Sequence, residues 1–198
     1  MRPKKGRMVS KYYEKYSPPI GFYVEIGAYD GVSKNSTILL EKKKWTGVCI
    51  EAHPKRFKKL VENRECKCIN AAIWKSTGEV DFAIMPEKKR GWDGIVETLP
   101  DRAKSYLPVS QIITIKSLTW EDLKLPKNIA YLQIDVEGAE LHILDTIDFS
   151  KYNIRHICLE DNNYHLSNGQ DLTYKKYMEK IGYKCVEELG VDHLYEKK

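Results

Sequence analysis

Short apolar runs in this sequence end repeatedly in acidic and small residues, a combination that can hold a polar ligand at a strand end. The first such segment lies between a strand-like and a helix-like run, and its residues are Glu25, Ile26, Gly27, Ala28, Tyr29, Asp30 and Gly31. Its glycines allow a tight turn with close backbone approach, as in nucleotide-binding turns. The spacing is G-x-x-x-G rather than the dinucleotide pattern, and the two acids would repel a pyrophosphate. We therefore expect a ligand without phosphate; the alternative is a turn whose glycines serve only packing.

A second acid, Glu51, ends the next strand-like run 24 residues after Gly27 and is followed by Ala52. An acidic side chain there can accept hydrogen bonds from both hydroxyls of a ribose. S-adenosylmethionine has a ribose, an ammonium and a sulfonium but no phosphate, so acidic groups suit it. Ala71 and Ala72 follow a third run and leave room for a flat base, although a plain strand exit would use the same residues. We predict this cofactor, held by these residues together with those of the first turn and Asp135.

Asp135 and Glu160 end the next two strand-like runs. Neighbouring strand ends in a parallel sheet lie about 5 Å apart, so we expect the two acids to face one crevice. The candidate bases for removing a hydroxyl proton are Asp135, Glu160, Asp161 and His165. Glu137 is a weaker candidate base and a possible substrate contact, but together with Glu140 it could instead serve only to start a helix.

A divalent metal is an open alternative at the same strand ends. Mg²⁺ prefers oxygen ligands, and the sequence offers four in this region: Asp135, Glu160, Asp161 and Asn162. This set is similar to the ligands of metal-dependent small-molecule O-methyltransferases.

The order of the runs predicts an α/β fold. Near-continuously apolar strands are expected at 21–26, 46–51, 66–72, 130–135 and 154–160, and helices at 35–43, 55–62 and 137–146. Strand-like segments at 183–188 and 191–196 flank Leu189-Gly190 and predict an antiparallel hairpin. The expectation is a Rossmann-like three-layer sandwich with a mostly parallel seven-stranded sheet that ends in this hairpin, as in class I methyltransferases.

We expect residues 21–198 to form the methyltransferase domain and the basic segment 1–20 to contain a short helix over the active site. Residues 86–111 show no strong periodicity, and we interpret them as a loop on the substrate side. Its aromatic residues Trp92 and Tyr106, with Tyr164 further on, are candidate contacts for a sugar ring. The alternative is that they only cover an edge of the core.

Composition excludes several classes of protein. The 198 residues contain no apolar run approaching the roughly 20 residues of a membrane-spanning helix, and no membrane association is expected. A net charge of +5 is too small, and its lysines too scattered, to predict specific nucleic-acid binding. The five cysteines are an odd number and lie mostly in predicted strands, which favours reduced thiols and a cytoplasmic location.

The ordered motifs resemble the FkbM family of methyltransferases. They are V-E-I-G-A-Y-D-G (24–31), C-I-E-A-H-P (49–54), N-A-A (70–72), D-V-E-G-A-E (135–140) and the acid at 160. The family's first motif more often reads D-x-G-A-N-x-G, so Glu25, Tyr29 and Asp30 are departures from it. The resemblance implies methyl transfer to a hydroxyl of a sugar, a glycan or another small molecule. The alternatives are a non-sugar natural product, RNA or protein as acceptor, or a non-catalytic cofactor-binding module of a larger chain.

Overall fold

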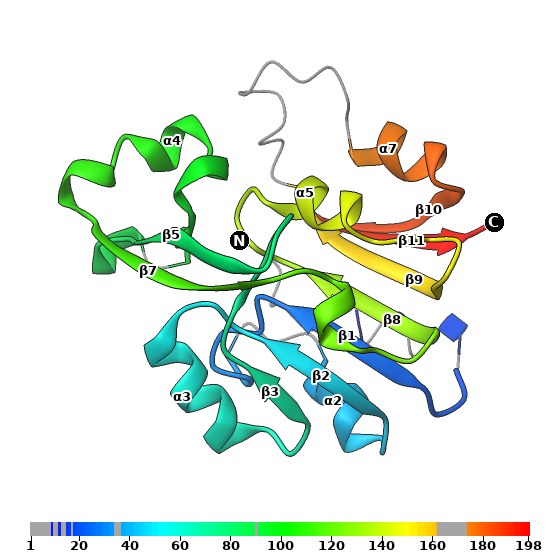
Figure 1. The fold of residues 1–198 in the computed structure, drawn as a ribbon. Coiled ribbons are helices and arrows are strands. Elements are labelled where there is room, and N and C mark those ends of the chain that lie inside the picture. The colour runs from blue at the N-terminus through cyan, green and yellow to red at the C-terminus, as the bar shows by residue number, and fades with distance from the viewer. Residues whose placement is uncertain are drawn as a thin grey trace.

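A central sheet of seven strands organises the chain in the computed structural model, which describes residues 9, 12, 15, 16, 18–33, 37–89, 91–161 and 174–198 (Figure 1). The strands are β1 (Phe22–Ile26), β2 (Thr46–Ile50), β3 (Lys67–Ile69), β8 (Asn128–Ile134), β9 (Asn153–Glu160), β10 (Tyr183–Leu189) and β11 (Asp192–Lys197). Their order across the sheet is β10-β11-β9-β8-β1-β2-β3. All neighbours from β3 to β9 are parallel, whereas β11 runs antiparallel to both β9 and β10.

The register of the parallel strands brings their carboxyl ends to one edge of the sheet. Ile26 at the end of β1 lies opposite Ile50 on one side and Ile134 on the other. All three side chains are buried, as expected for strands covered on both faces. The acids that follow these strands are therefore neighbours in space although they are far apart in the chain.

Helices cover both faces of the sheet (Figure 1). One face packs against α2 (Ile38–Lys42) and α3 (Pro54–Asn63) through Leu40 and Leu60. The other face packs against α5 (Glu140–Asp145) and α7 (Tyr174–Lys180), whose buried side chains include Ile143 and Met178.

The start of α3 is specified locally by its sequence. Pro54 occupies the first turn, where a backbone N–H has no acceptor within the helix, so the absence of this group in proline costs no hydrogen bond. The ring nitrogen Nδ1 of His53, the preceding residue, accepts a hydrogen bond from the Lys55 amide at 3.2 Å and caps the helix.

A second sheet, which the sequence did not predict, extends beside the carboxyl ends of the main strands (Figure 1). Its order is β4-β7-β5-β6, and its strands are β4 (Ala72–Ile73), β5 (Gly78–Ile84), β6 (Gly94–Ile95) and β7 (Gln111–Leu118). The run expected as one strand at 66–72 is thus divided, since β3 belongs to the main sheet and β4 to the second.

The segment 86–111, expected as a loop, contains short regular elements. They are β6, the helix α4 (Asp101–Lys104) and 3₁₀ turns at Glu87–Lys89, Val96–Thr98 and Leu107–Val109. These elements are too short to give a periodic sequence pattern. Leu99 and Ala103 of this segment are nevertheless buried against Ala83 in β5 and against Met85, which follows β5. A small core of its own therefore fixes this segment.

The bounds of one more helix differ from those expected. The helix expected from residue 137 begins at Glu140, because Glu137 and Gly138 have φ angles of 59° and 122° that no right-handed helix accepts. In the N-terminal segment, Val9 and Tyr12 are buried on the sheet face that α2 and α3 cover, near Tyr131. Within the part of the chain that the structure describes, no helix is long and apolar enough to cross a membrane.

Candidate active site

A cavity of about 260 Å³ lies at the carboxyl ends of β1, β2, β8 and β9, between the main sheet and the second sheet. Seven of the residues expected to bind a cofactor line it: Gly27, Tyr29, Glu51, Ala52, Ala71, Ala72 and Asp135. This is the edge at which open α/β sheets bind their ligands.

Gly27 sets the shape of the turn that enters the cavity. Its φ angle of 85° is unfavourable for any residue with a side chain. A Cβ atom there would lie 1.9 Å from the carbonyl oxygen of Asp135. The amides of Gly27 and Ala28 both donate to the Ile50 carbonyl oxygen, at 2.9 and 3.0 Å. The turn is thereby held between the ends of β2 and β8.

Glu51 is positioned by backbone hydrogen bonds from two directions. Its Oε2 accepts from the Tyr29 amide and its Oε1 from the His53 amide, each at 2.8 Å. The side chain is 5% exposed, and burial raises the pKa of its carboxyl group to about 7. A carboxylate has about four acceptor positions, so two remain for the hydroxyls of a ligand.

Asn70 holds the exit of β2 next to Glu51. Its side-chain amide donates to the carbonyl oxygens of Glu51 and Ala52, at 2.7 and 3.1 Å. The small side chains of Ala71 and Ala72 then line the cavity beside it.

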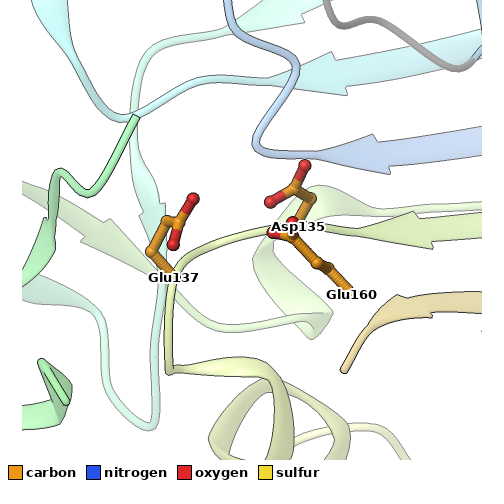
Figure 2. Close-up of side chains that lie close together, drawn as sticks. All are labelled: Asp135, Glu137 and Glu160. Atoms are coloured by element: carbon orange, nitrogen blue, oxygen red, sulfur yellow. The ribbon is translucent and has the colours of Figure 1, made fainter. Parts of the chain in front are cut away.

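Three acids meet at the ends of β8 and β9. Asp135, Glu137 and Glu160 each offer a carboxylate oxygen, and these oxygens lie within 4.8 Å of one another. Figure 2 shows Asp135 next to Glu160, with Glu137 across from them on the loop that follows β8. Glu137 reaches the cavity through its left-handed backbone conformation.

Glu140 belongs to the scaffold of this loop. It is fully buried and accepts from the amides of Val136 and Gly138, at 3.1 and 3.0 Å, and from the Tyr174 hydroxyl at 2.9 Å. Of the two acids expected at the helix start, Glu140 therefore organises the turn and Glu137 faces the cavity.

The cavity is strongly acidic in a chain of positive net charge. Six of its described lining residues are acids, and one, Arg56, is a permanent cation. The acids are Glu51, Asp93, Asp135, Glu137, Glu160 and Asp192. Asp192 lies opposite Glu160 in the β11–β9 register.

Arg56 and Asp93 join α3 to the segment 86–111. The Arg56 guanidinium forms a salt bridge with Asp93 and lies over the Tyr29 ring, 4.4 Å from its centroid. Asp93 is buried and also accepts from the Met85 amide at 2.6 Å. No sequence pattern pairs these residues, which are 37 positions apart.

Four residues expected at the cofactor do not line the cavity. Glu25 is 2% exposed and belongs to the opposite face of the sheet, where it accepts from the Thr37 hydroxyl at 2.5 Å and lies 3.5 Å from Arg64. Its side chain alternates with those of Val24 and Ile26, which face the other core. Asp30 accepts from the amides of Val32 and Ser33, while Ala28 and Gly31 pack against the scaffold.

The other expected residues that the structure describes, Trp92, Tyr106 and Asp161, are also not part of the cavity lining. Trp92 and Tyr106 contact each other with ring centroids 6.1 Å apart and pack on the small core around Met85, so they cover a core edge. The Asp161 carboxylate lies 3.8 Å from His193 and is not among the three clustered acids. Asn162, Tyr164 and His165 lie outside the described residues.

Solved structures of other proteins share this fold, and three of them illustrate it. They are the ribosomal protein L11 methylase from Lactobacillus delbrueckii subsp. bulgaricus (TM-score 0.51, 8% identity, 98% of this chain and 79% of that chain), monomeric WbdD (0.50, 11%, 96% and 41%) and the METTL16 MTase domain (0.50, 12%, 96% and 65%). The chain thus spans less than half of WbdD. A search of curated proteins returns no match.

The mixed sheet, the helices on both faces and these neighbours define the α/β fold of class I methyltransferases. The sequence profile of the methyltransferase FkbM domain matches residues 25–185. The chain belongs to the FkbM family of methyltransferases, which confirms the resemblance drawn from its motifs.

Proposed function

We propose that the chain is an S-adenosylmethionine-dependent O-methyltransferase that acts on a hydroxyl of a sugar or glycan. The observation that carries the proposal is the acidic cavity at the strand ends, where Glu51 and the cluster of Asp135, Glu137 and Glu160 face one space.

The lining residues fit this cofactor chemically. Glu51 has acceptor positions for ribose hydroxyls, and Ala71 and Ala72 leave room beside it for a flat base. S-adenosylmethionine supplies a methyl group activated on a positively charged sulfur, and it also carries an ammonium. Both charges suit a cavity with six acids, whereas a pyrophosphate would be repelled.

The chain must also place an acceptor hydroxyl and receive its proton. Asp135 and Glu160 lie at the ends of the adjacent strands β8 and β9, and Glu137 faces them from the loop that follows β8. A carboxylate held there can accept the proton as the oxygen gains its methyl group, and a positioned base contributes about 10²- to 10⁴-fold in rate. We assign this role to Asp135 or Glu160.

The same three oxygens could also serve a divalent cation. Mg²⁺ takes carboxylate oxygens and retains water ligands, which a sugar diol could replace. Glu137 would then take the place expected for Asp161 in the ligand set. Methyl transfer in excess EDTA distinguishes the two schemes, because undiminished turnover excludes the metal.

Transfer of a labelled methyl group to a panel of free sugars and glycans tests the proposal. We expect Asp135→Asn and Glu160→Gln to lower turnover by about 100-fold or more for whichever residue is the base. Glu62→Gln, on the exposed side of α3, is the matched control and should retain full activity. Transfer to RNA or protein but to no sugar would contradict the proposed acceptor while leaving the methyltransferase assignment intact.

A further inference from the structure

Three of the five cysteines gather on the sheet face opposite the α5 and α7 helices. Cys49 lies in β2, Cys68 is its direct partner in β3, and Cys66 precedes β3 by one residue. We call these three residues the cysteine cluster. They belong to the core around Leu40 and Leu60, and none of them lines the cavity.

The sulfur atoms of Cys49 and Cys66 are in contact, 3.5 Å apart. A disulfide requires about 2.05 Å, so the sulfurs need to approach by about 1.5 Å. Cys66 lies before the edge strand of the sheet and is half-buried, whereas Cys49 is fully buried in an inner strand. The edge residue can therefore make the movement, and it is also the one that a small oxidant can reach.

The surroundings favour a reactive thiolate at Cys66. Hydrogen bonding with Cys49 and with Cys68 lowers the pKa of the Cys66 thiol, and the positive charge of Arg64 lowers it further, against the effect of burial. Cys49 differs, because hydrogen bonding with Cys66 and burial raise the pKa of its thiol. The cluster therefore pairs an accessible thiol of lowered pKa with a buried thiol of raised pKa.

We propose that Cys66 and Cys49 form a peroxide-sensitive pair that closes reversibly to a disulfide. The Cys66 thiolate attacks one oxygen of hydrogen peroxide, the O–O bond breaks, and hydroxide leaves and takes a proton to become water. The product is a sulfenic acid at Cys66.

The second step consumes the buried thiol. The sulfur of Cys49 attacks the sulfur of Cys66, and the hydroxide that leaves combines with the Cys49 proton as water. The Glu25 carboxylate, whose Oε2 lies 3.7 Å from Cys49 Sγ, can relay this proton. Overall, two thiols and one peroxide give one disulfide and two waters.

Disulfide formation would act on the scaffold beneath the turn 27–31, which the proposed function assigns to the cofactor. Glu25 also accepts from Thr37 and lies beside Arg64, and these residues fix the chain that follows the turn. The disulfide would convert the Cys49 thiol, which lies 3.7 Å from Glu25 Oε2, into a group that can no longer donate a proton to this carboxylate. Any effect of the disulfide on cofactor affinity rests on the proposed function, whereas the formation of the disulfide does not.

Peptide mapping by mass spectrometry after treatment with hydrogen peroxide tests the pair on the full chain. We expect a peptide that links Cys49 to Cys66 with the loss of two hydrogens, and its disappearance after dithiothreitol. Cys66→Ser should abolish the link, and Cys68→Ser should retain it. Cys185→Ser, which changes a half-buried cysteine outside the cluster, is the matched control and should retain it as well.

Two further measurements keep the proposal falsifiable if a variant folds poorly. In the unmodified chain, Cys66 should react with iodoacetamide at least about tenfold faster than Cys185. In Cys49→Ser, dimedone should trap the sulfenic acid at Cys66. A link between Cys66 and Cys68, or oxidation of Cys185 at the same rate with no link, would overturn the proposal.

Discussion

The Glu51 carboxylate accepts a hydrogen bond from the Tyr29 amide over 2.8 Å and so connects the end of β2 to the turn that follows β1. One side chain thus both shapes the turn after β1 and faces the cavity with its remaining acceptor positions. We expect Glu51→Ala to weaken the binding of S-adenosylmethionine at least about tenfold, because hydrogen bonds to a charged acceptor contribute roughly 1.5–3 kcal/mol each. Isothermal titration calorimetry measures this, with Glu62→Ala as the control. Unchanged affinity would remove Glu51 from the proposed ribose site.

Cofactor affinity should depend on pH through Glu51. Its pKa is raised to about 7 by burial, so its carboxyl group is mostly protonated below that pH and loses acceptor capacity. We expect the Kd to rise as the pH falls from about 8 to about 6 and to level off above about 8. Methylthioadenosine is a suitable probe because it has no group that titrates in this range. In Glu51→Gln, the affinity should be lower and independent of pH.

The same shift predicts the effect of Glu51 on stability. Since the pKa in the folded state lies above the ordinary value of 4.5, the folded state retains a proton that the unfolded state releases. Glu51 therefore lowers the free energy of unfolding as the pH rises from about 4.5 to about 7. Thermal unfolding of the unmodified chain and of Glu51→Gln should show a difference that grows across this window. A constant difference would contradict the raised pKa.

Glu25, unlike Glu51, should contribute to stability and not to the binding of S-adenosylmethionine. It lies with Arg64 and Thr37 on the face of the sheet away from the cavity, and its carboxylate is buried. We expect Glu25→Gln to lower the free energy of unfolding by about 3 kcal/mol, because removing one charge leaves Arg64 buried with less compensation. The affinity for S-adenosylmethionine of the folded protein should change less than about threefold. A large loss of affinity with unchanged stability would restore the role that the sequence suggested.

The contrast between these two acids shows how far the sequence could predict the site. Both follow apolar strand residues and both lie near a small residue, so their sequence contexts look alike. The alternation of side chains along β1 decides the difference, because it sends Glu25 to the α2 and α3 face while the turn after the strand reaches the cavity. The sequence therefore predicts where the strands end. It does not predict the direction of the Glu25 side chain, which lies one residue before the end of β1.

The second sheet was missed for a different reason. β5 and β7 pair antiparallel from Gly78 opposite Ser117 to Ile84 opposite Gln111, and both strands are partly exposed. Polar and charged residues interrupt both strands, so the longest apolar run is the four residues 82–85, and their pairing spans a segment without periodicity. The contact of Asp93 with Arg56 depends on this pairing, so no local pattern could have revealed it.

The Arg56–Asp93 pair should hold the segment 86–111 against the cavity. Asp93→Ala would leave Arg56, whose side chain is 16% exposed, without its carboxylate, and we expect a loss of stability of about 3 kcal/mol. Glu97→Ala is the matched control within the same segment. It breaks a salt bridge with Lys75 in which both side chains are about 60% exposed, and should change stability by less than about 1 kcal/mol. Equal effects in urea unfolding would show that the buried pair does not fix the segment.

A substitution at Gly27 tests the close contact between the turn after β1 and the end of β8. Gly27→Ala places a Cβ 1.9 Å from the Asp135 carbonyl oxygen at a φ angle of 85°. Gly182→Ala is a close control, since Gly182 has a φ angle of 90° and nothing within 4 Å of a Cβ. Both variants carry the strain of a left-handed backbone, about 1 kcal/mol, but only the first must displace backbone. We expect Gly27→Ala to lose at least about 2 kcal/mol more stability than Gly182→Ala and to bind S-adenosylmethionine at least about tenfold more weakly, because the shifted turn also moves the Tyr29 amide away from Glu51. Equal losses in the two variants would mean that the turn can relax away from β8, and the cavity would then not depend on this contact.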